Sequence, residues 1–234
     1  NTRQFELFKK CLAVDTRYLE VGCSFGGVVS KVSNYGVKEC HVVEPNVEDA
    51  QFVTNTFDNI KVFNTTFNRT ELEKNYYDII VAFDVIEHVF TPGSFFKKCY
   101  DALRVGGRLV IAVPNHNDIL LTYYDCDKYK EFYYHKAHIN YFTSESIVDL
   151  GESVGFDGNV NSFLDYSFFN HVHWYQNNKP MGSGDTAFIG DVMKGDGFTT
   201  QINNFYKNVE LEYEKLVNEH MVGGALIYKG IKNV

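Results

Sequence analysis

The sequence contains no apolar run of the roughly 20 residues that a helix needs to cross a bilayer. Residues 1–10 also lack the apolar segment of a secretory signal peptide. The five cysteines are scattered, without C-x-x-C or paired Cys/His spacing, so the sequence predicts no disulfide framework and no metal site. We therefore expect a cytoplasmic protein with reduced thiols.

Basic side chains are outnumbered, since 22 Lys and Arg stand against 30 Asp and Glu, for a formal net charge of -8. Binding phosphate backbones or anionic lipid requires a basic surface, so the charge argues against general affinity for nucleic acid or membranes and leaves a local basic patch as the alternative. A chain of 234 residues with 44% hydrophobic side chains can bury one full core. We expect a single domain over residues 1–234, a monomer or homodimer whose partner is a small molecule.

Short apolar runs alternate with helical patterns through the first half of the chain. The runs predicted as strands are residues 18–22, 41–43, 60–63, 78–83 and 108–113. The helices predicted between them are residues 27–35, 47–57 and 94–103, with Asn46 and Ser94 as N-caps. Alternation of this kind predicts an α/β fold with a doubly wound, mainly parallel sheet and helices on both faces.

The pattern changes after Pro114. Residues 115–142 are polar and aromatic, and residues 164–200 are long, irregular and Gly-rich, so both are predicted as lid insertions over an acceptor site. Further elements are predicted as a helix at 143–154, a strand at 156–163, an amphipathic helix at 200–220 and a last strand at 222–231. The apolar face of the helix at 200–220 predicts core packing first and a dimer contact second.

A glycine-rich loop follows the first predicted strand, with Gly22, Ser24 and Gly26 in its turn. Glycines at this point permit a tight turn and close approach of the backbone to a ligand. Glu44 ends the second strand, where a carboxylate can accept the hydroxyl groups of an unphosphorylated ribose. The fingerprint G-x-G-x-x-G is missing, which disfavours NAD and FAD.

Segments 18–26, 42–45, 77–89 and 103–109, in this order and spacing, resemble class I S-adenosylmethionine-dependent methyltransferases. Segment 138–143 with Gly155-Phe156 also looks like the small-molecule, ubiquinone-biosynthesis-like branch, so the resemblance covers residues 18–156. It implies a Rossmann-like seven-stranded sheet with an antiparallel last strand. It also implies S-adenosylmethionine as methyl donor and S-adenosylhomocysteine as product. Ser24 stands where the family's first motif usually has glycine.

The resemblance also implies which residues hold the donor. Glu20, Gly22, Ser24 and Gly26 are expected around the methionine moiety, and Glu44 at the ribose. Thr66 and Phe67 are expected beside the adenine, and Phe83 and Asp84 near the sulfonium. The family often has an acidic residue beside the adenine, and residues 64–67 offer none. Backbone groups are the alternative partners there.

Histidines are the candidate catalytic groups, because an imidazole near neutral pKa can take a proton from a hydroxyl group. His88 follows the fourth strand and is the first candidate base, and His138 is the second. Helix capping and local pairing are the alternative for His88. The predicted acceptor-binding residues, for which aromatic packing is the alternative, are Tyr134, His135, His171, His173 and Trp174.

The hypothesis from the sequence is O-methylation of a small polar acceptor such as a sugar, a nucleotide-linked sugar or a phosphorylated precursor of a surface glycan. Lys128, Lys130 and Lys136 favour an anionic acceptor. Two alternatives stay open at this point: a noncatalytic methyltransferase-like subunit that binds the donor or a partner, and a nicotinamide-dependent oxidoreductase.

Overall fold

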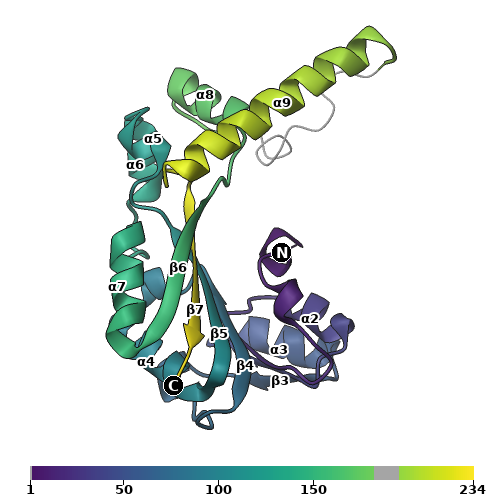
Figure 1. The fold of residues 1–234 in the computed structure, drawn as a ribbon, viewed down its shortest axis with the longest axis vertical. Helices are drawn as coiled ribbons and strands as arrows, with labels where there is room; N and C mark the ends of the chain where they lie inside the picture. The colour runs from purple at the N-terminus through teal and green to yellow at the C-terminus, as the bar shows by residue number, and fades with distance from the viewer. Residues whose placement is uncertain (1, 182–194) are drawn as a thin grey trace. The chain divides into compact units, whose positions relative to one another are not determined.

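A computed structural model describes residues 2–181 and 195–234 (Figure 1). The chain divides into two compact units. The first contains the described residues up to 113 together with 145–160 and 228–234, and the second contains 114–144 and the described residues within 161–227. None of the helices in these ranges is long and apolar enough to span a membrane.

Seven strands form one sheet in the order β3-β2-β1-β4-β5-β7-β6. The strands are β1 (Arg17–Val21), β2 (Glu39–Val43), β3 (Ile60–Phe63), β4 (Tyr77–Phe83), β5 (Leu103–Pro114), β6 (Phe156–Phe163) and β7 (Ala225–Lys232). The pairs among β1 to β5 are parallel, and β7 is antiparallel. This arrangement confirms the predicted Rossmann-like, doubly wound sheet.

The central strands are buried because their apolar residues are continuous and not alternating. In β4 every residue except Asp78 is buried, as expected for a strand covered on both faces. Leu19 of β1 pairs with Ile80, and Ile80 pairs with Leu109 of β5. All of these side chains are 0% exposed, so the core of the first unit runs through the middle of the sheet.

Helices cover the sheet on both sides. Figure 1 shows α2 (Val29–Tyr35) and α3 (Val47–Thr56) on one side, and α4 (Pro92–Ala102) and α7 (Ser144–Val154) on the other. The predicted N-cap Asn46 is confirmed, since its side chain accepts from the backbone N–H groups of Glu48 and Asp49. The prediction of Ser94 as N-cap is wrong: α4 begins at Pro92 after Thr91, because proline lacks an N–H and fits the first helical position.

Short helices complete the first unit: α1 (Thr2–Glu6), η1 (Lys9–Cys11), η2 (Phe67–Arg69) and η3 (Ile86–His88). Between α1 and η1, the ring of Phe8 is 1% exposed. It stacks on Tyr18 at 5.8 Å and on Phe83 at 6.1 Å between ring centroids. These contacts fasten the segment after α1 to β1 and β4.

The second unit contains α5 (Ile119–Thr122), α6 (Asp127–Tyr133), α8 (Phe168–Asn177) and α9 (Phe198–Glu219). One of its hydrophobic clusters is formed by Leu120, Leu121, Cys126, Tyr129, Tyr133 and Trp174. The expectation of an irregular segment after residue 164 is wrong over α8. That helix begins because Ser167 accepts from the Asn170 N–H, while the Glu210 carboxylate of α9 accepts from the Phe168 N–H at 3.0 Å.

Both predicted insertions, 115–142 and 164–200, belong to the second unit as far as they are described. Residues 182–194 of the second insertion lie outside the described residues. The helix predicted at 200–220 is α9, and it buries Asn203, Glu210 and Val217. The single domain over residues 1–234 stays a prediction.

Candidate functional site

A pocket of about 420 Å³ lies in the first unit at the carboxyl ends of β1, β2 and β4. This is the edge at which the strand order reverses, the usual ligand site of doubly wound sheets. The predicted residues that line it are Glu20, Gly22, Ser24, Glu44, Phe83 and Asp84. The pocket therefore gathers predicted residues that lie at or directly after the ends of three strands and are up to 64 positions apart (84 minus 20).

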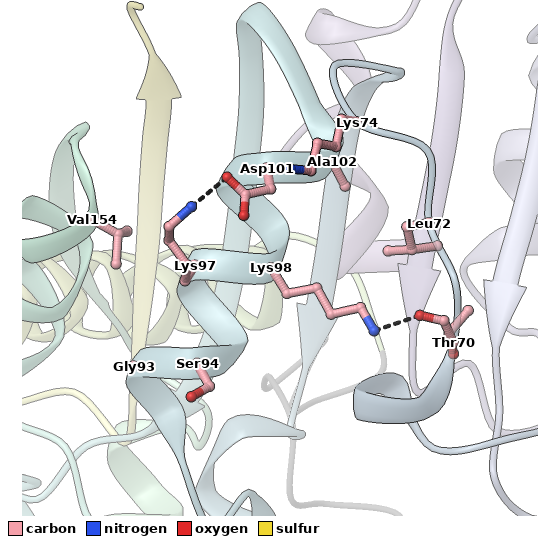
Figure 2. Close-up of a pocket in the computed structure, with 10 residues that line it drawn as sticks. All are labelled: Thr70, Leu72, Lys74, Gly93, Ser94, Lys97, Lys98, Asp101, Ala102 and Val154. Atoms are coloured by element: carbon pink, nitrogen blue, oxygen red, sulfur yellow. Dashed lines mark hydrogen bonds and ion pairs between the residues drawn. The ribbon is translucent and has the colours of Figure 1, made fainter.

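A larger pocket, of about 540 Å³, lies beside α4 (Figure 2). Lys97 and Lys98 line it, but protein acceptors already engage both ammonium groups. Lys97 pairs with the Asp101 carboxylate, and Lys98 donates to backbone carbonyl groups that include those of Asn68 and Thr70. The Lys98 contacts fasten the turn after η2 to α4, so this pocket shows a structural role for that lysine.

The backbone after β1 comes close to the smaller pocket because Gly22 has no side chain. Gly22 has a φ of +76°, in the left-handed region, and a Cβ there would lie 2.6 Å from Cγ2 of Val85. Its N–H donates to the Val43 carbonyl group at 2.8 Å, which joins the loop to the end of β2. Only glycine satisfies both the backbone angle and the contact.

The Glu44 carboxylate connects two turns at the pocket. Its Oε2 accepts from the Ser24 N–H at 2.9 Å, and its Oε1 accepts from the Asn46 N–H at 2.8 Å. A carboxylate oxygen has more than one acceptor position, so Glu44 can also accept ribose hydroxyl groups. The same contact holds Ser24 at a φ of +47°, which is unusual for a residue other than glycine.

Glu20 lies in the interior of the pocket wall and is 3% exposed. Burial raises the pKa of its carboxyl group to about 8, while hydrogen bonds from the Tyr18 hydroxyl and the Val29 backbone act in the opposite direction. Tyr18 donates to Oε2 of Glu20 at 2.9 Å. A carboxylate in this position can pair with a cationic group of a ligand.

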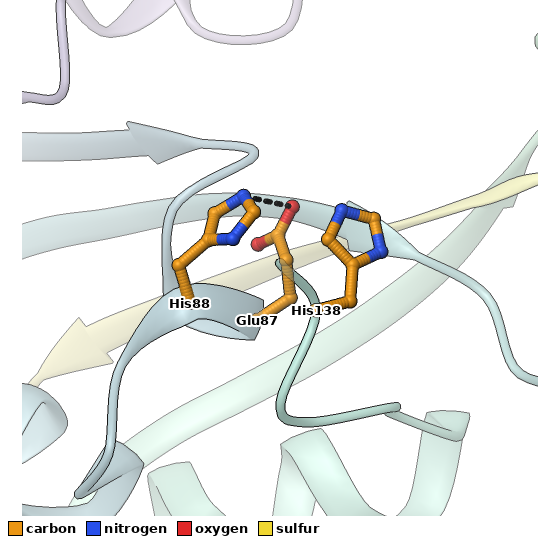
Figure 3. Close-up of side chains that lie close together, drawn as sticks. All are labelled: Glu87, His88 and His138. Atoms are coloured by element: carbon orange, nitrogen blue, oxygen red, sulfur yellow. Dashed lines mark ion pairs between the residues drawn. The ribbon is translucent and has the colours of Figure 1, made fainter. Parts of the chain in front are cut away.

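Acidic side chains also follow β4. Asp84 lines the pocket with a φ of +56°, and desolvation raises its pKa. Glu87 is 1% exposed, and burial raises its pKa to about 8. Its Oε1 lies 3.8 Å from Nε2 of His88, whose side chain is 42% exposed (Figure 3). The carboxyl group of Glu87 and the imidazole of His88 therefore lie side by side directly after β4.

Three of the predicted donor residues do not line the pocket. Gly26 has a φ of +77° and packs against α3, where a Cβ would lie 3.2 Å from Val53. Phe67 is 7% exposed, and its ring lies 4.7 Å from that of Phe95. Thr66 directly precedes η2, and its carbonyl group accepts from the Arg69 and Thr70 N–H groups. Contact between these three residues and a donor stays a prediction.

Some lining residues escaped the sequence analysis: Gln4, Cys23, Val28, Asp49 and Val85. Cys23 and Val85 adjoin predicted positions, and Asp49 lies in the first turn of α3, so the motifs could have indicated them. Gln4 has no such signal, because it reaches the pocket only through the packing of the N-terminal segment.

Two of the predicted acceptor residues lie in the interior of the second unit. His171 is 1% exposed, its Nδ1 lies 2.8 Å from the Tyr213 hydroxyl, and burial lowers its pKa to about 4. Trp174 is 5% exposed and packs edge-on against Tyr129, with 5.3 Å between ring centroids. These positions show packing, and contact with an acceptor stays a prediction.

The other candidates of the second unit are more accessible. Tyr134 is 45% exposed, and its hydroxyl lies 3.5 Å from Nδ1 of His116. The rings of His135 and His138 lie 3.8 Å apart. His173 is on α8, next to the Asn177 side-chain amide. The proposed catalytic role of His138 stays a prediction.

Comparison with known proteins shows which family this chain belongs to. Residues 3–160 match the family described as "Methyltransferase domain". The ubiquinone biosynthesis O-methyltransferase of Parvibaculum lavamentivorans is 30% identical over 104 residues, which cover 43% of this chain and 41% of that protein. The chain thus spans about two fifths of the length of the curated relatives it matches.

Solved structures resemble this chain over its whole length. The YcgJ protein of Bacillus subtilis superposes with a TM-score of 0.65 at 12% identity, covering 100% of both chains. Phosphoethanolamine N-methyltransferase 2 of Haemonchus contortus, solved with S-adenosyl-L-methionine, superposes with a TM-score of 0.61 at 16% identity, covering 99% of this chain and 53% of that one. At these identities the likeness is one of fold.

Proposed function

Because the chain belongs to the Methyltransferase domain family, which it matches over residues 3–160, we propose that it transfers a methyl group from S-adenosylmethionine to a small polar acceptor. S-adenosylmethionine is the methyl donor typical of this family. The observation that carries the proposal is the pocket at the reversal of the strand order, lined by Glu20, Gly22, Glu44 and Asp84. Its groups suit the methionine moiety, the ribose and the sulfonium of the donor.

In the proposed complex, Glu44 accepts hydroxyl groups of the ribose. Glu20 faces the ammonium group of the methionine moiety, and Gly22 lets the backbone approach it. Phe83 and Asp84, directly after β4, lie near the sulfonium. All of these residues line the same pocket, which supports a single bound orientation of the donor.

The reaction needs alignment more than chemical activation. A nucleophilic atom of the acceptor attacks the methyl carbon, the bond between that carbon and sulfur breaks, and its electron pair stays on sulfur to give S-adenosylhomocysteine. Holding the two reactants in line and excluding water supplies most of the rate enhancement. In the proposed complex, the residues that line the pocket align the donor.

The preferred reaction is O-methylation, with His88 as the base that receives the hydroxyl proton. His88 is accessible, and the Glu87 carboxyl group lies 3.8 Å from its Nε2. His138 is the second candidate base. The proposed acceptor is a sugar, a nucleotide-linked sugar or a phosphorylated glycan precursor, and the lysines and histidines of 128–138 support an anionic one.

A methyl transfer assay tests this proposal. The purified chain is incubated with S-adenosylmethionine and a panel of hydroxylated sugar phosphates, and S-adenosylhomocysteine is quantified. Turnover is expected, and His88→Ala should lower kcat by about 100-fold or more, the usual contribution of a general base. His220→Ala, a change at an exposed histidine of the second unit, is the matched control.

The possible outcomes separate the parts of the proposal. Full turnover by His88→Ala would show that His88 is not the catalytic base, and catalysis by positioning of the reactants would remain. Donor binding without turnover for any acceptor would point to a noncatalytic subunit. Failure to bind the donor at all would refute the proposed function.

A further inference from the structure

Tyr18 and Glu20 form a buried pair behind the donor pocket. They are two residues apart on β1 and therefore point to the same face of the sheet. The Tyr18 side chain is 0% exposed, and its hydroxyl donates to Oε2 of Glu20 at 2.9 Å. Of this pair, Glu20 lines the pocket.

The position of the Tyr18 ring is itself determined by packing. It stacks against Phe8, with 5.8 Å between ring centroids and 19° between ring planes. Its hydroxyl group thus presents a fixed donor to a flexible glutamate side chain. The Val29 backbone, at the start of α2, provides Glu20 with a second hydrogen bond. Together these donors select one orientation of the carboxylate.

We propose that Tyr18 is a positioning residue that orients the Glu20 carboxyl group for the ammonium group of the methyl donor, and that Glu20 ionises and releases a proton when the donor binds. This inference rests on the proposed function. In the proton balance, the carboxyl proton of Glu20 goes to solvent, and the carboxylate then pairs with the ammonium group.

The groups around Glu20 support this coupling. Burial raises its pKa to about 8, and Glu44 across the pocket raises it further. The Cys23 and Cys40 thiols also face it, and burial raises their pKa, so they stay neutral. The free protein therefore carries Glu20 largely protonated at neutral pH. Affinity for a ligand with an ammonium group should increase with pH, by up to about tenfold per unit below pH 8.

The test compares two ligands that share adenosine and a thioether sulfur. S-adenosylhomocysteine has the ammonium group, whereas 5′-methylthioadenosine has no amino acid part. Calorimetric titration of the protein between about pH 6.5 and 8.5 should show pH-dependent affinity for the first ligand and weaker pH dependence for the second. Repeating the titration in buffers of different ionisation enthalpy measures the released proton directly.

Tyr18→Phe removes the hydroxyl group and keeps the ring against Phe8. It should weaken S-adenosylhomocysteine binding by about tenfold or more, the usual effect of a lost hydrogen bond to a charged group. It should also move the increase in affinity to higher pH and leave 5′-methylthioadenosine binding within about twofold. The matched control is Tyr77→Phe, which removes a buried hydroxyl that lies 2.9 Å from His41 Nδ1 and outside the pocket lining.

Unchanged affinity and an unchanged pH profile in Tyr18→Phe would overturn the inference, as would equal weakening of both ligands. If the variant does not fold, the wild-type protein still decides, because binding of S-adenosylhomocysteine without proton release contradicts the coupling. Failure of the wild-type protein to bind either ligand would refute the proposed function instead.

Discussion

The backbone N–H of Ser24 donates a hydrogen bond to Oε2 of Glu44 at 2.9 Å, so one carboxylate joins the loop after β1 to the end of β2. The loop residue is in the left-handed region, and the carboxylate is 6% exposed. A candidate ligand-binding side chain is therefore also part of the scaffold that shapes its own pocket. Changes at this contact should affect stability and donor binding together.

Glu44→Gln should lower both the stability of the protein and its affinity for the donor. An amide nitrogen must then face one of the two backbone N–H groups that the carboxylate now accepts, those of Ser24 and Asn46. The loss of a charged acceptor should lower the free energy of unfolding by about 1–3 kcal/mol. Urea denaturation and calorimetric titration with S-adenosylhomocysteine measure the two effects. Glu48→Gln, at an exposed position of α3, is the control, and equal behaviour of both variants would contradict the role of Glu44.

Ser24→Gly should stabilise the protein. The φ of +47° strains a residue that has a Cβ, and glycine removes this strain at some cost in the entropy of the unfolded chain. The expected net gain is about 0.5 kcal/mol in the free energy of unfolding. Ser30→Gly within α2 should lose about 0.5 kcal/mol, because glycine is a poor helix former. Urea denaturation measures the stability of both variants. A loss of stability in Ser24→Gly equal to that in Ser30→Gly would show that the backbone of Ser24 is not strained.

Gly22→Ala should destabilise the protein. The new Cβ meets Cγ2 of Val85 at 2.6 Å and also requires a left-handed alanine, for a combined cost of about 2–4 kcal/mol. Gly36→Ala is a matched control, since its φ is +87° and a Cβ there meets nothing within 4 Å. Thermal unfolding should show the larger loss for Gly22→Ala. Equal losses would mean that the contact with Val85 contributes nothing.

The second unit should lose stability in acid because of His171. Its pKa is about 4 in the folded protein, below the usual 6.5, so the unfolded chain binds more protons between these values. The stabilisation is complete above about pH 6.5 and decreases as the pH falls toward 4, by roughly 3 kcal/mol in total. Urea denaturation followed by the fluorescence of Trp174, the single tryptophan, measures this change.

His171→Asn tests whether His171 causes the loss of stability in acid. This variant should be less stable at neutral pH, since it loses the contact with Tyr213, and its stability should depend less on pH. His220→Asn, at an exposed position, should keep the wild-type slope. The same slope in all three proteins would show that His171 is not responsible.

The predicted strands β1 to β5 agree with the structure because runs such as 78–83 express burial on both faces within a few residues. The helix α8 was missed although Ser167 is a local N-cap signal, and the second acceptor at its start, Glu210 of α9, is distant in the sequence and leaves no local pattern. Phe67 was expected beside the adenine, but its ring packs against Phe95, a partner 28 positions away (95 minus 67).

The sequence by itself determined the alternation of strands and helices from β1 to β5, the glycine loop after β1 and the acidic end of β2, because backbone angles and hydrophobic periodicity are local properties. Only the tertiary structure decided which polar side chains meet. It buried Glu20 against Tyr18, brought Gln4 to the pocket and placed His171 in the interior of the second unit. Burial and the resulting pKa shifts depend on groups from several elements, and their distances arise only when the chain has packed.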